Sequence, residues 1–184
     1  MAQSWRVKAE RQRNPRLPLD EEGLERLGVS YAGRYGTTRA KLAAYLGRKL
    51  RERGWAGAGA PPVERLVARF AALGYVDDRA FAAAKASSLL RRGYGERRVR
   101  DALQAAGIEE EDAAPARDEA GDQAFAAALR FAERRRIGPY AAVAPDRPQR
   151  EKAVAAMLRA GHRGDIVRRI LAAAPGEVPD PDSF

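Results

Sequence analysis

The chain has 184 residues, a net charge of +9 and no cysteine, so disulfides and thiolate zinc sites are excluded. The single histidine, His162, argues against a histidine-based metal site or a catalytic triad. No run approaches the ~20 apolar residues of a membrane span, and the N-terminus has no apolar signal segment, so we expect a cytoplasmic protein with no cofactor.

The positive charge is concentrated toward the N-terminus. Residues 1–55 carry a net charge of +7, and 29 of the 34 basic residues of the chain are arginine. Residues 1–19 hold five basic groups and two prolines without apolar periodicity, which predicts a flexible basic arm. Trp5 within this arm is either a contact residue or docks on its own domain. Arginine suits contacts with phosphates and carboxylates, although a GC-rich coding bias explains the arginine content equally well.

Eight helices and no strand are predicted after the arm. In chain order they begin at Asp20, at Thr37 or Thr38, at Pro61, at Asp77, after Gly95, at about Asp118 and at Asp146, and the last holds Ile166 to Leu171. The stretch 54–62 is rich in glycine and proline and predicts a flexible linker.

A short phrase ends five of these helices. It consists of an apolar residue, three helix-favouring residues, a glycine and a bulky residue, as in the sequence from Phe70 to Tyr75. A glycine after a helix adopts the left-handed conformation and turns the next residue back onto the last turn. The glycines of the phrase are Gly54, Gly74, Gly93, Gly107 and Gly161. Repeated helix ends favour an array of small helical units with a long binding surface over a single enzymatic pocket.

The helices group in threes. We expect a first repeat with its linker over 20–60, a second repeat over 61–112, a third over 113–174, and a disordered acidic tail over 175–184. A gapless alignment of 89–103 with 157–171, with six identities in fifteen positions, supports a repeat.

Three further motifs have structural explanations. Asp77 and Asp78 resemble an acid/base or metal pair, but they lie at a helix start, where Asp77 is expected to be the N-cap and Asp78 to lie in the positive first turn. His162 occupies the position that Trp55, Tyr75 and Tyr94 occupy in the other copies of the phrase, which predicts that its ring is half-buried and has a packing role. The sequence from Gly93 to Gly95 lacks the lysine and the preceding strand of a phosphate loop, so we expect a tight turn.

Clusters of cations are the candidate partner-binding residues. One cluster is Arg91, Arg92, Arg97, Arg98 and Arg100, another is Arg48, Lys49, Arg51 and Arg53, and a further arginine run covers 134–136. A solvated helix face explains such clusters as well as a partner does, because cations are favoured at helix C-termini. Arg97 and Arg98 lie instead in a first turn, where cations oppose the helix dipole, so they are the preferred functional pair.

The sequence from Gly74 to Phe81 (GYVDDRAF), together with that from Leu90 to Leu103 and the pair Gly107 and Ile108, resembles the central signature of the RecX family, regulators of the RecA recombinase. The resemblance implies an all-α fold of tandem three-helix repeats stacked into an elongated, curved array. It implies binding in the groove of the RecA–DNA filament, inhibition of ATP hydrolysis and strand exchange, and no catalytic residue. His162 departs from the family, which more often has an aromatic ring there.

Two other functional classes stay open. An autonomous basic helical DNA-binding module would explain the basic arm and the net charge, although no recognition helix is identifiable. A nuclease would depend on Asp77 and Asp78 alone. For the RecX reading we expect a monomer that binds the RecA filament and no membrane, and direct contact with DNA is left open.

Overall fold

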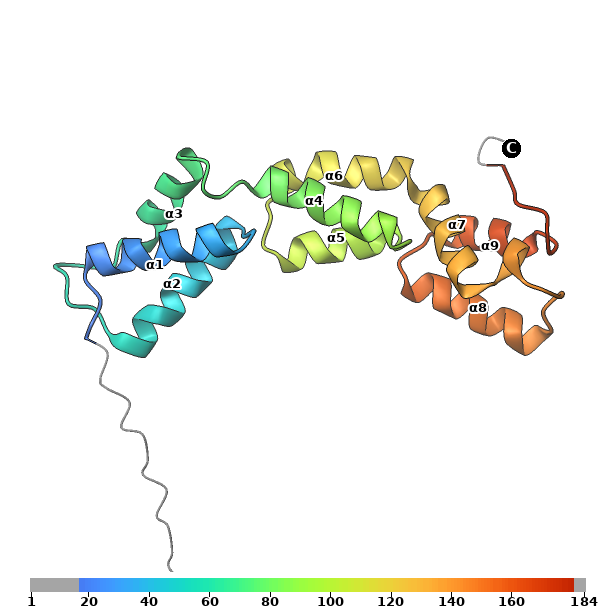
Figure 1. Cartoon of the computed structure of the whole chain (residues 1–184), viewed down its shortest axis with the longest axis horizontal. Coiled ribbons are helices and arrows are strands. Elements are labelled where there is room, and N and C mark those ends of the chain that lie inside the picture. The colour runs from blue at the N-terminus through green and yellow to red at the C-terminus, as the bar shows by residue number, and fades with distance from the viewer. Residues whose placement is uncertain (1–16, 181–184) are drawn as a thin grey trace, which may run out of the picture.

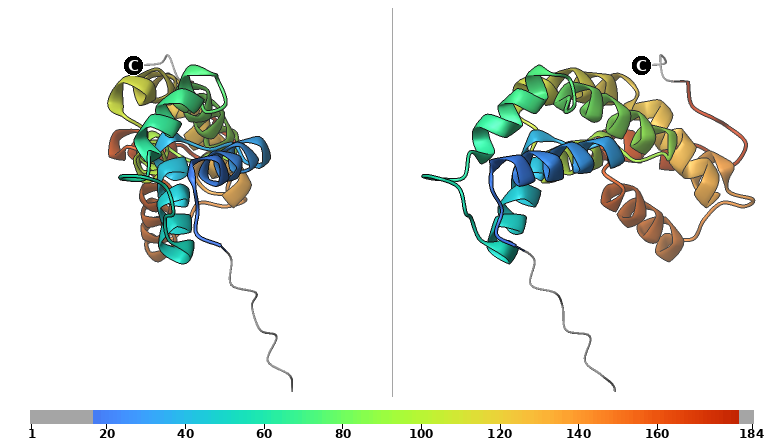
Figure 2. Two further views of the ribbon diagram at one scale, coloured as in Figure 1. Left: turned by 90° about the vertical axis from the view of Figure 1, so that its left-hand side faces the viewer. Right: turned by 60° about the vertical axis from the view of Figure 1, so that its left-hand side comes forward.

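The computed structural model describes residues 17–180. In this range it contains α1 (Glu21–Arg34), α2 (Arg39–Arg53), α3 (Val63–Ala72), α4 (Asp78–Arg91), α5 (Glu96–Ala105), α6 (Glu110–Asp122), α7 (Ala124–Arg135), the short 3-10 helix η1 (Gly138–Tyr140), α8 (Arg147–Arg159) and α9 (Gly164–Ala172). Figure 1 shows α1 to α3, α4 to α6 and α7 to α9 as successive groups along one long axis. The right-hand view of Figure 2 shows that this row bends into an arch. The predicted all-α, elongated and curved array of three-helix repeats is therefore confirmed.

The first core is formed by α1, α2 and α3. Leu24 of α1, Leu42 and Leu46 of α2, and Phe70 of α3 are all buried in it. A Cβ at Gly28 of α1 would lie 2.4 Å from the Phe70 ring, so the missing side chain lets α3 lie close to α1. The expected range of 61–112 for the second repeat placed α3 in the wrong unit, because its apolar side chains face the first core.

The second core is formed by α4, α5 and α6. Its larger side chains come from α4 and α5 and include Leu90 and Leu103, whereas α6 contributes only alanines. These small residues allow α6 to lie close to α4. They also leave α6 without the periodic pattern of large apolar residues from which a helix is predicted. We expected one helix from about 118 to 136; the structure has two, which meet at Gln123. Pro115 inside α6 further hides this helix from sequence reasoning.

The third core is formed by α7, α8 and α9. Phe131, Met157, Val167 and Ile170 are buried there. Across residues 17–180, no helix is long and apolar enough to cross a membrane.

The chain segments at both ends of the array are held more firmly than expected. Leu19 is 2% exposed, its N–H donates to the carbonyl of Gly54 at 3.0 Å, and its carbonyl accepts from the N–H of Ala56 at 2.8 Å. Residues 17–19 therefore belong to the first repeat, and the expected boundary of the basic arm at 19 is wrong. Trp5 and the rest of the arm lie outside the described residues. Near the other end, the N–H of Gly176, in the expected tail, donates to Pro139 at 2.8 Å.

The repeated glycine phrase forms the predicted helix ends. All five glycines have positive φ: Gly54, Gly74, Gly93, Gly107 and Gly161. At the last four, the N–H after the glycine donates back to a carbonyl in the last helical turn, as from Tyr94 to Leu89 at 3.0 Å. Gly54 is the exception: its ψ of 173° is not that of the left-handed helix, and its carbonyl accepts from the N–H of Leu19. α7 ends in a similar way without glycine, since Arg136 has a φ of 52°.

Candidate partner-binding surface

The second helices of the three repeats, α2, α5 and α8, form an end-to-end row. Figure 1 shows the C-terminal end of α5 beside the start of α2, and the C-terminal end of α8 beside the start of α5. At the second of these junctions, the N–H of Gly95 donates to Ala160 at 3.0 Å and the N–H of Arg97 donates to Gly161 at 3.2 Å. Unpaired amides at one helix start thus meet unpaired carbonyls at another helix end, with favourable alignment of the helix dipoles.

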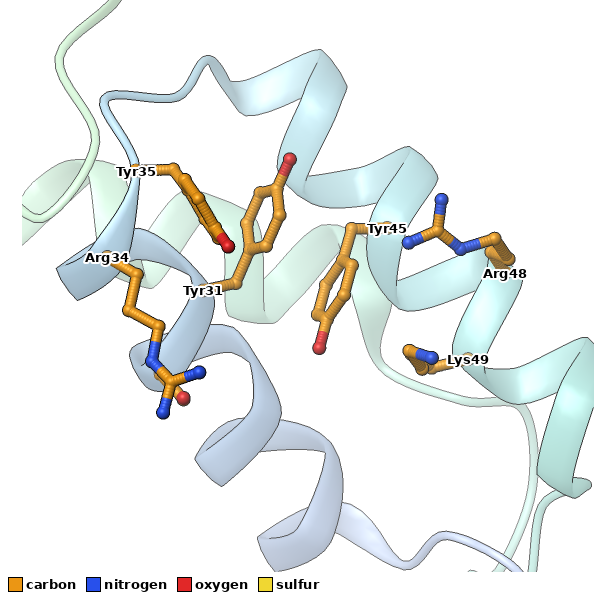
Figure 3. A pocket seen from close by; sticks show the side chains of 7 residues that line it. Tyr31, Arg34, Tyr35, Tyr45, Arg48 and Lys49 are labelled. Atoms are coloured by element: carbon orange, nitrogen blue, oxygen red, sulfur yellow. The ribbon is translucent and has the colours of Figure 1, made fainter.

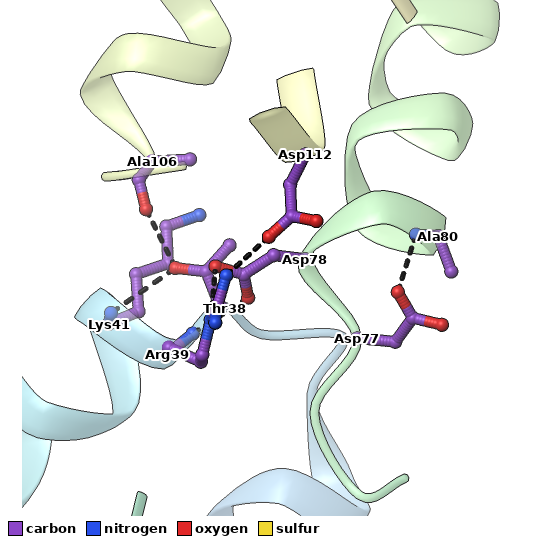
Figure 4. Close-up of polar contacts among 8 residues, drawn as sticks. All are labelled: Thr38, Arg39, Lys41, Asp77, Asp78, Ala80, Ala106 and Asp112. Atoms are coloured by element: carbon purple, nitrogen blue, oxygen red, sulfur yellow. Dashed lines mark hydrogen bonds and ion pairs between the residues drawn. The ribbon is translucent and has the colours of Figure 1, made fainter. Parts of the chain in front are cut away.

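The first junction is built in the same way, but with a side chain. Of the two predicted candidates, Thr37 and Thr38, the N-cap of α2 is Thr38, and its hydroxyl accepts from the N–H of Lys41 at 3.2 Å. The same hydroxyl donates to the carbonyl of Ala106, at the end of α5, at 2.7 Å. One threonine therefore both starts α2 and binds it to the next repeat (Figure 4).

An ion pair between a buried carboxylate and a partly exposed arginine completes the first junction. Asp78 is 5% exposed; it accepts from the backbone N–H of Arg39 at 2.9 Å and from the Arg39 guanidinium at 3.2 Å. The guanidinium also binds Asp112 of α6, so Arg39 connects α2 to both α4 and α6 (Figure 4). The hydrogen bond with Asp78 raises the pKa of Arg39. The sequence predicted Asp78 only as a first-turn carboxylate and gave no sign of this partner.

The two adjacent aspartates have different structural roles. Asp77 is the N-cap of α4, as predicted, and accepts from the N–H of Ala80 at 2.8 Å. Asp78 is turned toward the first repeat and bound by Arg39. No cluster of three or more metal-binding side chains occurs within residues 17–180. The geometry at this pair therefore gives no support to the nuclease alternative.

The second junction is apolar around a buried histidine. His162 is 5% exposed, so it is buried more deeply than the half-burial that we expected. Its ring lies edge-on to Phe131 at a centroid distance of 5.3 Å. Because a carbonyl only accepts, Nε2 carries the proton and donates to Gly93 at 3.2 Å. Burial lowers the pKa of His162 to about 4, and the bond to Gly93 opposes this shift only in part. His162 is thus a neutral packing residue between the second and third repeats.

Arg97 takes part in this junction, so one premise of the sequence analysis was wrong. Its guanidinium donates to the carbonyl of Leu158, in the last turn of α8, at 2.7 Å. The cation opposes the dipole of its own helix but complements that of α8. Arg97 therefore has a reason to be there from folding alone. Of the preferred pair, Arg98 is then the cation in a first turn that folding does not explain. It is exposed and lies 5.8 Å from the centre of the Tyr94 ring.

The remaining cations of the second-repeat cluster are dispersed. Arg92 lies 5.2 Å from the centre of the Tyr94 ring, and Arg91 donates to the Ser87 hydroxyl at 2.7 Å. Arg100 lies on another side, 4.0 Å from Asp101. Arg92 therefore shares the Tyr94 ring with Arg98, whereas Arg91 and Arg100 have other neighbours.

The first-repeat cluster divides in two. Arg53 donates to the carbonyl of Leu17 at 2.7 Å and so holds the chain before α1, while Arg51 is exposed. Arg48 and Lys49 line a cavity of about 430 Å³ between α1 and α2. We define this cavity as the tyrosine pocket, and Figure 3 shows its main lining side chains: Tyr31, Arg34, Tyr35, Tyr45, Arg48 and Lys49. The sequence analysis did not single out these three tyrosines, because no local pattern brings them together.

Comparison with known proteins agrees with this architecture. Residues 77–116, which cover most of α4 to α6, match the family model described as RecX, second three-helix domain. The chain is 33% identical over 105 residues to "Regulatory protein RecX" of Agrobacterium fabrum (strain C58), a match that spans 57% of this chain and 56% of that protein. It is 28% identical over 177 residues to "Regulatory protein RecX" of Myxococcus xanthus (strain DK1622), across 90% of this chain and 94% of that protein.

Solved structures share the fold. A crystal structure of RecX from Lactobacillus salivarius superposes with a TM-score of 0.65 at 16% identity, over 82% of this chain and 94% of that one. A crystal structure titled regulatory protein RecX gives a TM-score of 0.57 at 18% identity, over 82% and 72% of the two chains. The three-helix repeats, the match of residues 77–116 to the family model and the relative aligned over most of its length agree: this chain is similar to RecX regulatory proteins in sequence and in fold.

Proposed function

We propose that this chain regulates the RecA recombinase, mainly as an inhibitor, by binding in the groove of the RecA–DNA filament and modulating ATP hydrolysis and strand exchange. The observation that carries this proposal is the elongated, curved array of three repeats in a chain whose relatives are named regulatory protein RecX.

The array suits a filament because its contacts are spread along one axis. Once one repeat is bound, the others are held near their sites at a high effective concentration. The two junctions fix the relative placement of the repeats through hydrogen bonds such as that from Arg97 to Gly161 at 3.2 Å. A fixed ligand that prefers one arrangement of neighbouring filament subunits shifts that equilibrium by its difference in affinity.

We assign the contacts to the candidate cations that are exposed and take no part in a repeat junction. They are Arg48, Arg51, Arg91, Arg92, Arg98 and Arg100. Arg97 is left out of this set because it binds Leu158. Guanidinium groups suit the carboxylates of an acidic protein face and the phosphates of DNA alike.

The test is an assay of DNA-dependent RecA ATP hydrolysis and strand exchange in which this protein is titrated. We expect both activities to fall, and we expect inhibition to persist when free DNA is added in large excess. Inhibition that vanishes in excess DNA would contradict the proposal and support the alternative, an autonomous basic DNA-binding module. That module would bind DNA equally tightly with or without RecA.

A further inference from the structure

The first repeat exposes an aromatic ring that packing alone does not explain. Tyr35, the residue after α1, is 59% exposed. Its ring centre lies 5.5 Å from that of Tyr31, which is itself stacked on Tyr45 at 4.2 Å with an interplanar angle of 11°. Figure 3 shows the three rings side by side across the space between α1 and α2. The Tyr35 ring is tilted by 51° to that of Tyr31, so Tyr31 does not cover its face, and this exposed face is a ready surface for another planar group.

The tyrosine pocket is also positively charged. Its lining contains three cations, Arg34, Arg48 and Lys49, and no acidic residue. Glu52 lies just outside, 2.6 Å from the Lys49 ammonium and 3.6 Å from the Arg48 guanidinium. These pairs are surface pairs on one helix, worth less than ~1 kcal/mol, so a phosphate can displace Glu52 from Arg48. Arg34, in the last turn of α1, forms no ion pair with an acidic side chain among the described residues.

Within the pocket, the ring of Tyr35 is the one left for stacking. Tyr45 already has Tyr31 against it, and the Arg48 and Lys49 cations lie 5.5 Å and 5.8 Å from its ring centre. Those two cations therefore lie beside the stacked pair of Tyr31 and Tyr45, where they can neutralise the charge of a bound phosphate without covering the ring of Tyr35. The volume of the tyrosine pocket, about 430 Å³, falls within the range of small-ligand sites.

We propose that the tyrosine pocket binds one nucleotide unit of a single-stranded nucleic acid. The base stacks on Tyr35, and Arg34 and Arg48, which lie on opposite sides of the rings in Figure 3, bind phosphates of the adjoining backbone. Proteins that hold single strands combine these same two parts, an aromatic face for the base and cations for the backbone. The inference concerns direct contact with nucleic acid, and it does not depend on the proposed action on RecA.

Other ligands use less of the pocket. In a duplex the faces of the bases are stacked inside the helix, so Tyr35 would have no ring to meet. An acidic peptide would engage Arg34 and Arg48 but would leave the exposed ring of Tyr35 without a planar partner. A similar group at Tyr94, with Arg92 and Arg98, is less suitable because Tyr94 is half-buried and packs against two repeat cores.

The experiment is fluorescence anisotropy with the full chain and no RecA, at low salt. The probe is a labelled oligothymidylate of about 12 nucleotides. Two competitors separate the sources of binding: an abasic phosphodiester oligomer of the same length, and polyglutamate of similar charge. We expect the oligothymidylate to bind more tightly than either competitor, because only it supplies both rings and phosphates.

Matched variants locate the site. Tyr35→Ala should weaken binding about tenfold, the usual loss for one stacked base. Tyr75→Ala is the control, because Tyr75 is 56% exposed in the same repeat but lies outside the pocket, and it should leave binding unchanged. Tyr35→Phe keeps the ring and should bind like the parent chain. Arg34→Gln should lower the slope of log affinity against log salt concentration by about 0.7, as expected for one lost phosphate contact on a single strand. Arg79→Gln is the control, because Arg79 is exposed on α4 and does not line the pocket, and it should leave this slope unchanged.

The proposal fails if Tyr35→Ala and Tyr75→Ala bind the oligothymidylate equally well, provided that their unfolding midpoints match. It also fails if the abasic oligomer competes as well as the oligothymidylate, which would mean that charge alone is recognised. Tighter binding of polyglutamate, with the same loss in Tyr35→Ala, would replace the nucleic acid by an acidic protein segment. Because RecA is absent, none of these outcomes decides the proposed regulation.

Discussion

Gly95 at the start of α5 lies directly against Gly161 at the end of α8. A Cβ placed on Gly95 would be 2.3 Å from the carbonyl carbon and oxygen of Gly161. This carbonyl accepts from the N–H of Arg97 at 3.2 Å, so the contact is part of the junction between the second and third repeats. A side chain at Gly95 would therefore push two backbones apart rather than move a flexible group.

Gly95→Ala is expected to lower the free energy of unfolding by about 1–3 kcal/mol, because it overpacks this junction. Gly33→Ala is the matched control: a Cβ at Gly33, inside α1, would have no atom within 4 Å. Alanine favours the helix, so that variant should be neutral or slightly more stable. Urea unfolding of both variants checks this, and equal midpoints would contradict the junction geometry.

Asp78→Ala is expected to destabilise the chain by about 1–3 kcal/mol. The change leaves the backbone N–H of Arg39 without its partner and removes one of two carboxylates from the guanidinium. The neighbouring Asp77→Ala should cost about 1 kcal/mol, the value of one helix cap. Thermal unfolding of the two variants compares the stability lost at the repeat junction with the stability lost at a helix cap.

Mg²⁺ serves as the control for this pair. Since Asp77 caps α4 and Asp78 binds Arg39, added Mg²⁺ should leave the melting temperature of the parent chain unchanged. A rise in the parent but not in Asp78→Ala would restore the metal-site reading.

His162 is expected to make the fold sensitive to mild acid. Its pKa in the folded chain is about 4, below the ordinary 6.5, so the unfolded state takes up a proton first as the pH falls. The contribution of the neutral His162 to the free energy of unfolding is fully present above pH 6.5 and is lost progressively as the pH falls toward about 4. Between about pH 7.5 and pH 5 the loss should be about 2 kcal/mol.

The check is urea unfolding of the parent and of His162→Phe at both pH values. Phenylalanine keeps a ring beside Phe131 but cannot bind a proton, so the variant should lose less stability on acidification. Identical losses in the two proteins would show that carboxylates alone set the acid response.

Arg97 and Arg98 are expected to separate a folding role from a partner-binding role. Arg97→Ala removes the bond to the Leu158 carbonyl and should cost about 1 kcal/mol of stability. Arg98→Ala removes an exposed cation, so stability should hardly change while inhibition of RecA weakens. Unfolding and RecA ATPase titrations on both single variants give the answer, and unchanged inhibition in Arg98→Ala would remove it from the proposed contact set.

The elongated shape can be measured in solution. A compact chain of this length has a radius of gyration of ~16 Å, and the arch in Figure 2 should exceed it. Small-angle X-ray scattering provides the value. A result at or below the compact value would mean that the repeats fold back on one another.

Much of this fold is local and could be predicted from the sequence. A helix cap connects residues only three to five positions apart, and this is why Asp77 and the repeated glycines were assigned correctly and the cap of α2 was narrowed to Thr37 or Thr38. The same locality misled one alignment: 89–103 matches 157–171, yet the first segment spans α4 and α5 and the second spans α8 and α9. The shared pattern is a helix end followed by a helix start, and it is out of phase with the three-helix repeat.

The tertiary structure alone decided which helices share a core and which charges are bound. Arg39 and Asp78 are 39 positions apart, and Arg97 and Leu158 are 61 apart, so no local pattern links them. The tyrosine pocket likewise needs the end of α1 to lie beside α2, although each ring by itself fits an apolar stripe. Local preferences fix where a helix begins and ends, because few atoms are involved. The burial of a charge or the meeting of two rings depends on how whole helices pack, and that is set by the combined shape of side chains far apart in the sequence.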